Sequence, residues 1–335
     1  MITNNTHPLT ASKICIALFA VWLSVCNVAG ESFTYRDKMN RSISVEIPVK
    51  RAVLLNGTEL LPITGAWQRV VGLSRTALGA NDLLKVIKPD LAELIPSVGN
   101  NHHINAEKLL KLRPDIVLLW SANPEIINYL SKRNIPIIAV FPENILELYE
   151  MMRLHGKLFA SEANIESAIV KMRTMFSLIK KRVGIIPDEQ RKKALWIFSK
   201  PTRIGGGVGI YNDITSIIGQ HNLGQKFSQH TVDVSLEQLL AWNPDVIYIW
   251  GHARYSAADI LNNPQWRHIT AVKEKRVFKV PKWDTWSPRM APLALWLAAA
   301  VYPEQFEDLN IDHEIDQFYR DVYGVTYKDV QQIEN

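Results

Sequence analysis

Short apolar runs alternate with amphipathic stretches along most of the chain. The apolar runs, which predict buried strands, lie at residues 52–56, 70–73, 135–141, 194–198 and 276–280. Helices are predicted between Gly57 and Trp67 and near residues 212–218, with a loop over 199–209 before the second helix. Strands that alternate with helices predict an α/β protein with mostly parallel sheets. Residues 33–47 alternate polar and apolar side chains instead, which predicts a leading hairpin.

A sequence repeat divides the chain into two halves. Residues 105–120 (NAEKLLKLRPDIVLLW) and 235–250 (SLEQLLAWNPDVIYIW) share Glu, Leu-Leu, Pro-Asp and a final Trp, about 130 residues apart. Each copy predicts a short amphipathic helix that ends at the Pro-Asp pair and a buried strand that follows it. The period exceeds the roughly 20–50 residues of solenoid repeats, so the repeat predicts two similar α/β lobes.

A long helix is predicted between the two halves. Apolar residues recur at helical spacing from Ser161 to about Val183. At 1.5 Å per residue such a helix is about 33 Å long, and a stiff connection of this kind limits how far one lobe rotates against the other. The alternative is an ordinary helix within one lobe. The predicted organisation is a signal peptide over 1–30, a first lobe over 31–158, a bridging helix over 159–185 and a second lobe over 186–335.

The first 30 residues have the pattern of a secretory signal peptide. A single basic residue, Lys13, precedes the apolar run Ile14–Val25, and small residues follow before Glu31. The apolar run is too short to span a membrane. An alternative is a lipoprotein acylated at Cys26, although Val25 occupies a position where such a signal has a small residue. The segment predicts export from the cytoplasm.

Composition excludes several function classes. Both cysteines, Cys15 and Cys26, lie in the predicted signal peptide, so disulfides, thiolate nucleophiles and Cys-based zinc sites are not expected. The chain has 38 Lys and Arg against 33 Asp and Glu, a net charge of +5, with no dense basic run. This mild excess argues against nucleic acid as a partner. The motifs G-x-S-x-G and HExxH are absent, which leaves a secreted hydrolase as a remote alternative.

The order of these segments resembles the periplasmic binding proteins of ABC importers for iron–siderophore, haem and cobalamin. The resemblance covers roughly residues 33–325. Its phrases are Asp37–Arg41, Pro48–Arg51, Val98–Gly99, Asn105–Asp115, Val234–Leu240, Pro244–Asp245, Leu295–Glu304 and Phe318–Gly324. It implies two three-layer α/β lobes with mostly parallel sheets, joined by a single long helix, with the ligand in the cleft between them. It also implies a periplasmic, monomeric protein with no intrinsic cofactor.

The resemblance implies a permease dimer as partner. In that family one surface glutamate per lobe docks into arginine pockets of the permease, and Glu107 and Glu237 match those positions. The two glutamates also occupy equivalent places in the repeat, as a dimeric partner with one pocket per lobe would require. The alternative is that both are solvated helix-surface residues.

Candidate ligand-binding residues lie at strand ends and in the loops after them, because ligands of open α/β sheets bind there. They are Asn56, Thr58, Arg75, His102, His103 and Trp120 in the first half, and Arg203, Tyr211, His252, Tyr255, Trp283, Trp286 and Arg289 in the second. The arginines suit a carboxylate or an oxyanion, and the aromatic rings provide stacking walls. The alternative for each tryptophan is a place in the core, and for Arg289 a structural salt bridge.

The pair His102-His103 is a candidate metal contact, and His252 follows the equivalent strand in the second half. Neutral imidazole binds iron, cobalt and nickel, so one such residue would complete the coordination of a metal chelate. The alternative is exposed loop histidines. The run Gly205–Gly209 lacks the Lys-Ser/Thr of a P-loop and the spacing of GxGxxG. It predicts either a tight turn or backbone amides that approach a ligand.

The function expected from these observations is capture of a metal chelate, such as a ferric siderophore or a related cobalt or nickel complex, for delivery to an ABC importer. Cobalamin or haem is one alternative, and an oxyanion such as molybdate or tungstate is another. A protein that senses its ligand for a membrane receptor, without uptake, is a further alternative.

Overall fold

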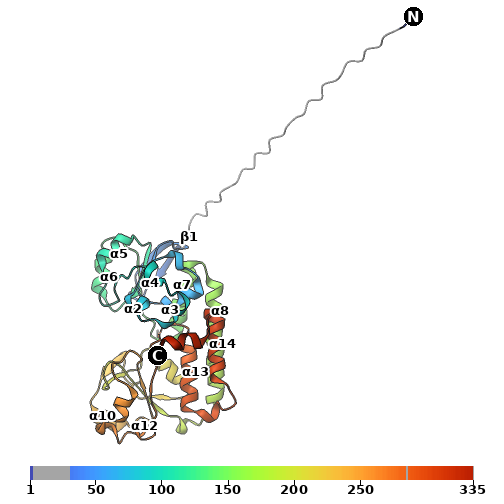
Figure 1. The fold of residues 1–335 in the computed structure, drawn as a ribbon. Coiled ribbons are helices and arrows are strands. Elements are labelled where there is room, and N and C mark those ends of the chain that lie inside the picture. The colour runs from blue at the N-terminus through green and yellow to red at the C-terminus, as the bar shows by residue number, and fades with distance from the viewer. Residues whose placement is uncertain (3–30, 284–285, 335) are drawn as a thin grey trace. The chain divides into compact units, whose positions relative to one another are not determined.

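The computed structural model describes residues 1–2, 31–283 and 286–334 (Figure 1). The predicted signal peptide, apart from its first two residues, and the candidate acylation site Cys26 lie outside the described residues. Within the described ranges, no helix combines the length and the apolar character that crossing a bilayer requires.

The first described strands form an antiparallel hairpin of β1 (Glu31–Arg36) and β2 (Ser42–Ile47). The hairpin predicted from the alternating pattern is therefore confirmed. Its turn is held by the buried carboxylate of Asp37, which accepts hydrogen bonds from the backbone N–H groups of Met39 and Arg41 and pairs with the Arg41 guanidinium.

The first lobe contains a four-stranded parallel sheet in the described chain. Its strand order is β4 (Val70–Leu73), β3 (Ala52–Leu54), β5 (Ile116–Trp120) and β6 (Ile137–Val140). Nearly all of these strand residues are buried, as expected for strands covered on both faces by helices. The predicted strands of the first half are confirmed.

Helices connect and cover this sheet. They are η1 (Thr58–Leu60), α1 (Leu61–Thr64), η2 (Trp67–Arg69), α2 (Arg75–Gly79), α3 (Asp82–Ile87), α4 (Leu91–Leu94), α5 (Ala106–Leu112), α6 (Pro124–Ser131) and α7 (Ile145–Phe159). The single helix predicted between Gly57 and Trp67 is wrong. Gly65 adopts the left-handed conformation (φ 65°), which ends α1 and starts a new turn before η2.

The second lobe contains a six-stranded mixed sheet in the described chain. Its strand order is β10 (Thr231–Asp233), β8 (Arg203–Gly205), β7 (Lys193–Ile197), β11 (Val246–Ile249) and β12 (Val277–Lys279), and β9 (His221–Asn222) also pairs with β7. Strands β7, β9, β11 and β12 are parallel, whereas β8 pairs in antiparallel orientation with both β7 and β10. The loop predicted over 199–209 is wrong at β8, because a tight turn between Lys200 and Arg203 folds the chain back on β7.

The glycine run after β8 permits close packing of backbone against backbone. The N–H of Gly206 donates to the carbonyl of His230, and that of Gly207 to the carbonyl of Phe227. A Cβ atom on Gly206 would lie 2.0 Å from the carbonyl oxygen of Gln229. These amides are used within the lobe, so the run forms a tight turn.

The remaining helices belong mostly to the second lobe. They are η3 (Asp188–Gln190), α9 (Ile210–Ile217), α10 (Leu236–Trp242), α11 (Ala257–Leu261), η4 (Pro264–Trp266), α12 (Thr270–Lys273), α13 (Met290–Val301), η5 (Pro303–Gln305), α14 (Ile311–Tyr323) and α15 (Tyr327–Glu334). The last of them, α15, packs against α3 of the first lobe.

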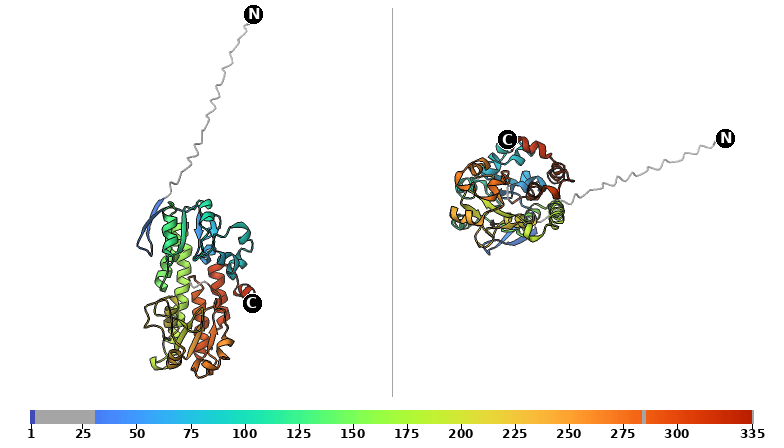
Figure 2. Two further views of the ribbon diagram at one scale, coloured as in Figure 1. Left: turned by 90° about the vertical axis from the view of Figure 1, so that its left-hand side faces the viewer. Right: turned by 90° about the horizontal axis from the view of Figure 1, so that it is seen from below.

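The predicted long helix is α8 (Glu162–Val183), 22 residues in length. Figure 2 shows it running beside both lobes, and it packs against α7 and α13. Its apolar stripe, which includes Ile169 and Met172, is buried. One hydrophobic cluster extends from Leu54 in the first sheet through this stripe to Tyr248 in the second sheet. The predicted fold class, two α/β lobes joined by one long helix, is confirmed.

The two copies of the repeat have the same local structure. Helix α5 is capped by Asn105 and α10 by Ser235, whose side chains accept hydrogen bonds from the backbone of the first turn. Each following aspartate fixes the start of a neighbouring strand. The carboxylate of Asp115 accepts from the N–H of Arg51, and that of Asp245 accepts from the N–H of Lys193. The Pro-Asp pair therefore ends a helix and aligns two strands in each lobe.

Candidate ligand-binding site

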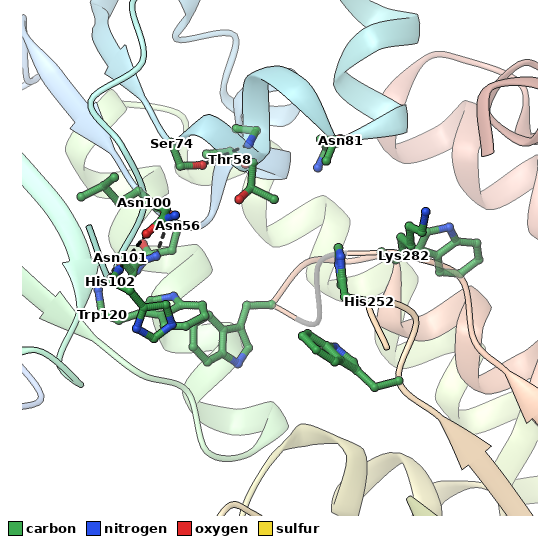
Figure 3. Close-up of a pocket in the computed structure, with 17 residues that line it drawn as sticks. Asn56, Thr58, Ser74, Asn81, Asn100, Asn101, His102, Trp120, His252 and Lys282 are labelled. Carbon is green, nitrogen blue, oxygen red and sulfur yellow. Dashed lines mark hydrogen bonds between the residues drawn. The ribbon is translucent and has the colours of Figure 1, made fainter. Parts of the chain in front are cut away.

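Loops from the carboxyl ends of strands in both sheets enclose a cavity of about 310 Å³ (Figure 3). The loops follow β3, β4 and β5 in the first lobe and β11 and β12 in the second. The lining residues are Leu55, Asn56, Thr58, Ser74, Thr76, Ala77, Ala80, Asn81, Asn100, Asn101, His102, Trp120, Trp250, His252, Lys282, Trp283 and Trp286.

Seven of the predicted ligand-binding residues line this cavity together. They are Asn56, Thr58, His102, Trp120, His252, Trp283 and Trp286. Segments more than a hundred residues apart therefore converge at one place, as the strand-end argument predicted. Their role in binding remains a prediction.

An aromatic wall joins the two lobes at the cavity. The indole of Trp120 lies edge to face against that of Trp286, and the Phe141 ring lies 5.0 Å from Trp286 between centroids. The imidazole of His102 meets Trp120 at 5.9 Å, and in the second lobe His252 lies 5.1 Å from Trp250. Such walls bury the apolar faces of a ligand and leave ring edges and imidazole nitrogens available to polar groups.

Two asparagines fix the loop that carries His102. The amide of Asn101 donates to the carbonyl of Leu55 (3.0 Å) and accepts from the N–H of Trp120 (2.9 Å), which ties the loop to the ends of β3 and β5. The Asn100 side chain accepts hydrogen bonds from the N–H groups of His102 and His103. These bonds explain why His102 faces the cavity from a short, ordered turn (Figure 3).

Two polar groups in the cavity wall have no protein partner in the described chain. Asn56 is 5% exposed, and neither atom of its side-chain amide has a hydrogen bond. The indole N–H of Trp120 is likewise buried without an acceptor. Leaving buried polar groups unpaired costs about 1–3 kcal/mol each, so a ligand that supplies hydrogen bonds is favoured at this wall.

The described part of the cavity lining carries a positive charge. Among the described lining residues Lys282 is the only lysine or arginine, and none is an aspartate or glutamate. Although the His252 side chain is exposed, the protein around its ring partly desolvates the imidazole and lowers its pKa, and the charge of Lys282 lowers it further. His252 is therefore neutral at physiological pH and has a lone pair for a metal ion. The described residues contain no cluster of three or more His, Cys, Asp or Glu arranged to hold a metal ion.

Three predicted arginines lie outside the cavity wall. Arg289 is fully buried, and its guanidinium makes a bidentate pair with Asp82 at 2.7 Å and contacts Glu59 at 3.1 Å. Arg289 therefore forms a structural salt bridge, which was the alternative to a ligand-binding role. Arg203 pairs with Asp233 on the edge of the second sheet, and Arg75 is exposed at the start of α2. The predicted arginine-rich lining is not found.

Three further predicted residues are also placed away from the lining. The hydroxyl of Tyr211 donates to the carbonyl of Val208, and that of Tyr255 donates to the carbonyl of Phe198. Burial raises the pKa of both hydroxyls, so they remain protonated donors to backbone. His102 and His103 are both exposed, but of the two only His102 is among the residues that line the cavity.

A sequence model of the family described as periplasmic binding protein matches residues 53–282. The chain belongs to the periplasmic binding protein family. The match begins in β3 and ends at Lys282, so it covers strands of both sheets and all the lining residues of the cavity except Trp283 and Trp286.

Curated relatives of this periplasmic binding protein differ in what their names say they bind. The molybdate-binding protein MolA of Haemophilus influenzae is 27% identical over 94% of this chain and 97% of its own. A vitamin B12-binding protein of Yersinia pestis is 24% identical over 61% of this chain and 77% of its own.

Solved structures share the fold. CeuE of Helicobacter pylori, described as a Ni-His complex, is 26% identical and superposes with a TM-score of 0.80 over 90% of this chain and 99% of its own. The H. influenzae MolA structure with bound molybdate is 24% identical, with a TM-score of 0.76 over 88% and 99%. The predicted family of solute-binding proteins is confirmed.

In this periplasmic binding protein the two candidate docking glutamates are exposed at the surface. Glu107 lies in the first turn of α5 and pairs with Lys111 one turn later (2.7 Å). Glu237 lies in the first turn of α10, where a backbone N–H and the Ser235 hydroxyl lower the pKa of its carboxyl. Both side chains are accessible, as a docking residue must be.

Proposed function

We propose that this periplasmic binding protein captures a small, negatively charged metal chelate in the cavity and delivers it to the permease of an ABC importer. The observation that carries the proposal is the composition of the wall. It combines imidazoles from both lobes, His102 and His252, with a lysine and no carboxylate among the described lining residues.

The size of the cavity favours a small complex. About 310 Å³ is at the lower end of the roughly 300–1,000 Å³ of small-molecule sites. Cobalamin and haem are much larger, so they require wider separation of the lobes. A compact chelate of nickel, cobalt or iron fits the present walls.

The metal would bring most of its donors with it. Two histidines do not fill the coordination sphere of a first-row ion, and the described chain offers no larger cluster. His102 or His252 would then complete the coordination of a chelated metal. The likeness to CeuE, whose structure is described as a Ni-His complex, supports this reading.

A second candidate is an oxyanion such as molybdate or tungstate. It is favoured by the unpaired amide of Asn56, the unpaired indole N–H of Trp120 and the charge of Lys282, all donors suited to anionic oxygen. The 27% identity to a molybdate-binding protein supports it as well.

In either case the protein would bind its ligand and release it unchanged rather than act as an enzyme. Delivery would use Glu107 and Glu237, one on each lobe, against a dimeric permease, with the binding protein as a monomer. Exposed ion pairs of this kind contribute orientation and association rate more than affinity.

The direct test is to export the full chain in its own host, purify it without denaturation and measure bound metal and bound organic mass in the same sample. Metal together with an organic chelator supports the first candidate, and molybdenum or tungsten without an organic partner supports the second. His102→Ala and His252→Ala should lose a metal chelate. His313→Ala, an exposed histidine on α14, should retain it. A bound ligand that contains no metal would overturn both candidates.

A further inference from the structure

A buried ion-pair cluster connects the two lobes beside the cavity. Arg289 follows the cavity residue Trp286 in the second lobe and is 0% exposed. The two acidic partners that the structure describes, Asp82 and Glu59, belong to the first lobe. The guanidinium makes two hydrogen bonds of 2.7 Å to Asp82 and one of 3.1 Å to Glu59.

The acidic partners adjoin residues of the first-lobe wall. Glu59 follows Thr58 within η1, and Asp82 follows Asn81 at the start of α3. The side chain of Asn81 donates to the same Glu59 oxygen that Arg289 contacts (2.7 Å) and accepts from the N–H of Leu84. One guanidinium therefore fixes the two elements that carry Thr58 and Asn81 to the cavity.

The second-lobe wall contacts the same group. The guanidinium carbon lies 4.6 Å from the centroid of the Trp283 ring, which lines the cavity, and the Arg289 Nε donates to the Tyr319 hydroxyl (2.8 Å). Helix α15, on which Val330 is buried, packs against α3 and adds a further contact between the two lobes.

We propose that Arg289 is a positioning residue for the cavity. It sets the spacing between the first-lobe wall at Thr58 and Asn81 and the second-lobe wall at Trp283, without contacting the ligand. The planar guanidinium is suited to this task because its bidentate bonds fix both distance and orientation, whereas a lysine ammonium is a point charge. The inference rests on the proposed function of the cavity as a ligand site.

The test compares full-length variants that disturb this cluster with a matched control. Arg289→Lys and Asp82→Asn break the contact between the lobes. Asp37→Asn breaks another buried carboxylate–guanidinium pair, but its partner Arg41 lies in the same hairpin turn. Amide hydrogen exchange is measured without ligand, and affinity is measured by calorimetry for two probes, nickel(II) with L-histidine and sodium molybdate.

We expect both cluster variants to exchange about tenfold faster in η1 and α3 and to bind the probe of the wild type about tenfold more weakly. The control should lower the melting temperature to a similar extent and leave both quantities unchanged. Equal effects of Asp37→Asn and Asp82→Asn on affinity would overturn the proposal, since loss of stability alone would then explain them.

A replacement variant and a measurement without ligand cover the cases in which a variant does not fold or a probe does not bind. If Arg289→Lys does not fold, Glu59→Gln replaces it, because this change keeps the shape of the side chain and removes its charge. If the wild type binds neither probe, the proposed ligand classes fail. The exchange data on η1 and α3 still decide whether Arg289 holds these elements, and unchanged exchange there overturns the positioning role.

Discussion

The indole rings of Trp120 and Trp286 meet edge to face across the two lobes, with centroids 4.8 Å apart and an angle of 73° between their planes. Trp120 ends a strand of the first sheet, and Trp286 follows the last strand of the second sheet. Because both line the cavity, any ligand that occupies it changes the surroundings of at least one indole. The contact therefore provides both a wall and an optical reporter.

Replacement of Trp286 by alanine should weaken ligand binding and lower stability together. The side chain is 6% exposed, and removal of a buried tryptophan costs about 3–5 kcal/mol of unfolding free energy. Trp286→Phe keeps an aromatic wall and should therefore retain most of the ligand affinity and most of the free energy of unfolding. Urea unfolding and fluorescence titration with the purified ligand measure the two effects, and an unchanged affinity of Trp286→Ala would exclude this wall from the binding site.

His102 and His103 should respond differently to replacement. Only the first of the two lines the cavity, although the sequence offers no distinction between them. His102→Ala should reduce the affinity for a metal chelate by about tenfold or more, whereas His103→Ala should change it by less than about twofold. Isothermal titration with nickel(II) and L-histidine checks this, and a larger loss for His103→Ala would contradict the assignment.

Lys282 should contribute to the affinity for an anion through its charge. Lys282→Met is expected to weaken molybdate or an anionic chelate by about fivefold at low salt and by less at high salt, because salt screens partly exposed charges. Lys273→Met, an exposed position on α12, is the control with the same change of charge. Equal effects of the two changes would attribute the loss to net charge rather than to the cavity.

The sequence predicts the framework of this protein well because the framework depends on local signals. Apolar runs and the prolines that follow the two repeat helices act within a few positions, and the helices α5 and α10 lie where the pattern indicates. Gly65 and the turn before β8 were missed because glycine and short turns permit several conformations.

The role of a charged side chain is harder to predict because it depends on distant partners. Arg289 and Asp82 are 207 positions apart, and nothing near either residue in the sequence indicates the pair. Lys282 lies one position before a predicted tryptophan and was not predicted, because a single lysine there has the same local pattern as an ordinary surface lysine. Asn81 was missed because it belongs to a helix start rather than to a strand end.

The buried histidine His155 should make the protein sensitive to acid. It lies under Gly57 with both ring nitrogens unpaired in the described chain, and burial lowers its pKa from 6.5 to about 4. The unfolded state therefore takes up a proton first as the pH falls below 6.5. The contribution of His155 to the free energy of unfolding is therefore fully present above pH 6.5 and is lost as the pH falls towards 4.

From the pKa shift of His155 alone, we expect the free energy of unfolding to fall by about 2 kcal/mol between about pH 7.5 and about pH 5. His155→Leu should remove that part of the pH dependence. Urea unfolding curves over this range measure the difference between the wild type and the variant. Parallel pH profiles of the two proteins would show that His155 is accessible to protons in the folded state.

Charge reversal at the two surface glutamates should separate binding from delivery. The double variant Glu107→Arg/Glu237→Arg should bind its ligand with the affinity of the wild type, since both residues are exposed outside the cavity wall. Uptake by whole cells should fall by about tenfold or more because two arginines would face basic pockets. Glu125→Arg, on a different helix of the first lobe, is the control, and normal uptake by the double variant would disprove docking.

The hydrophobic cluster that continues from Leu54 through α8 to Tyr248 couples the stabilities of the two lobes. Because the core is continuous, the two lobes are expected to unfold together in one cooperative transition. A ligand bound between the lobes then raises the free energy of unfolding of both of them. A protease that cuts only the globally unfolded chain would therefore attack either lobe more slowly when the ligand is bound.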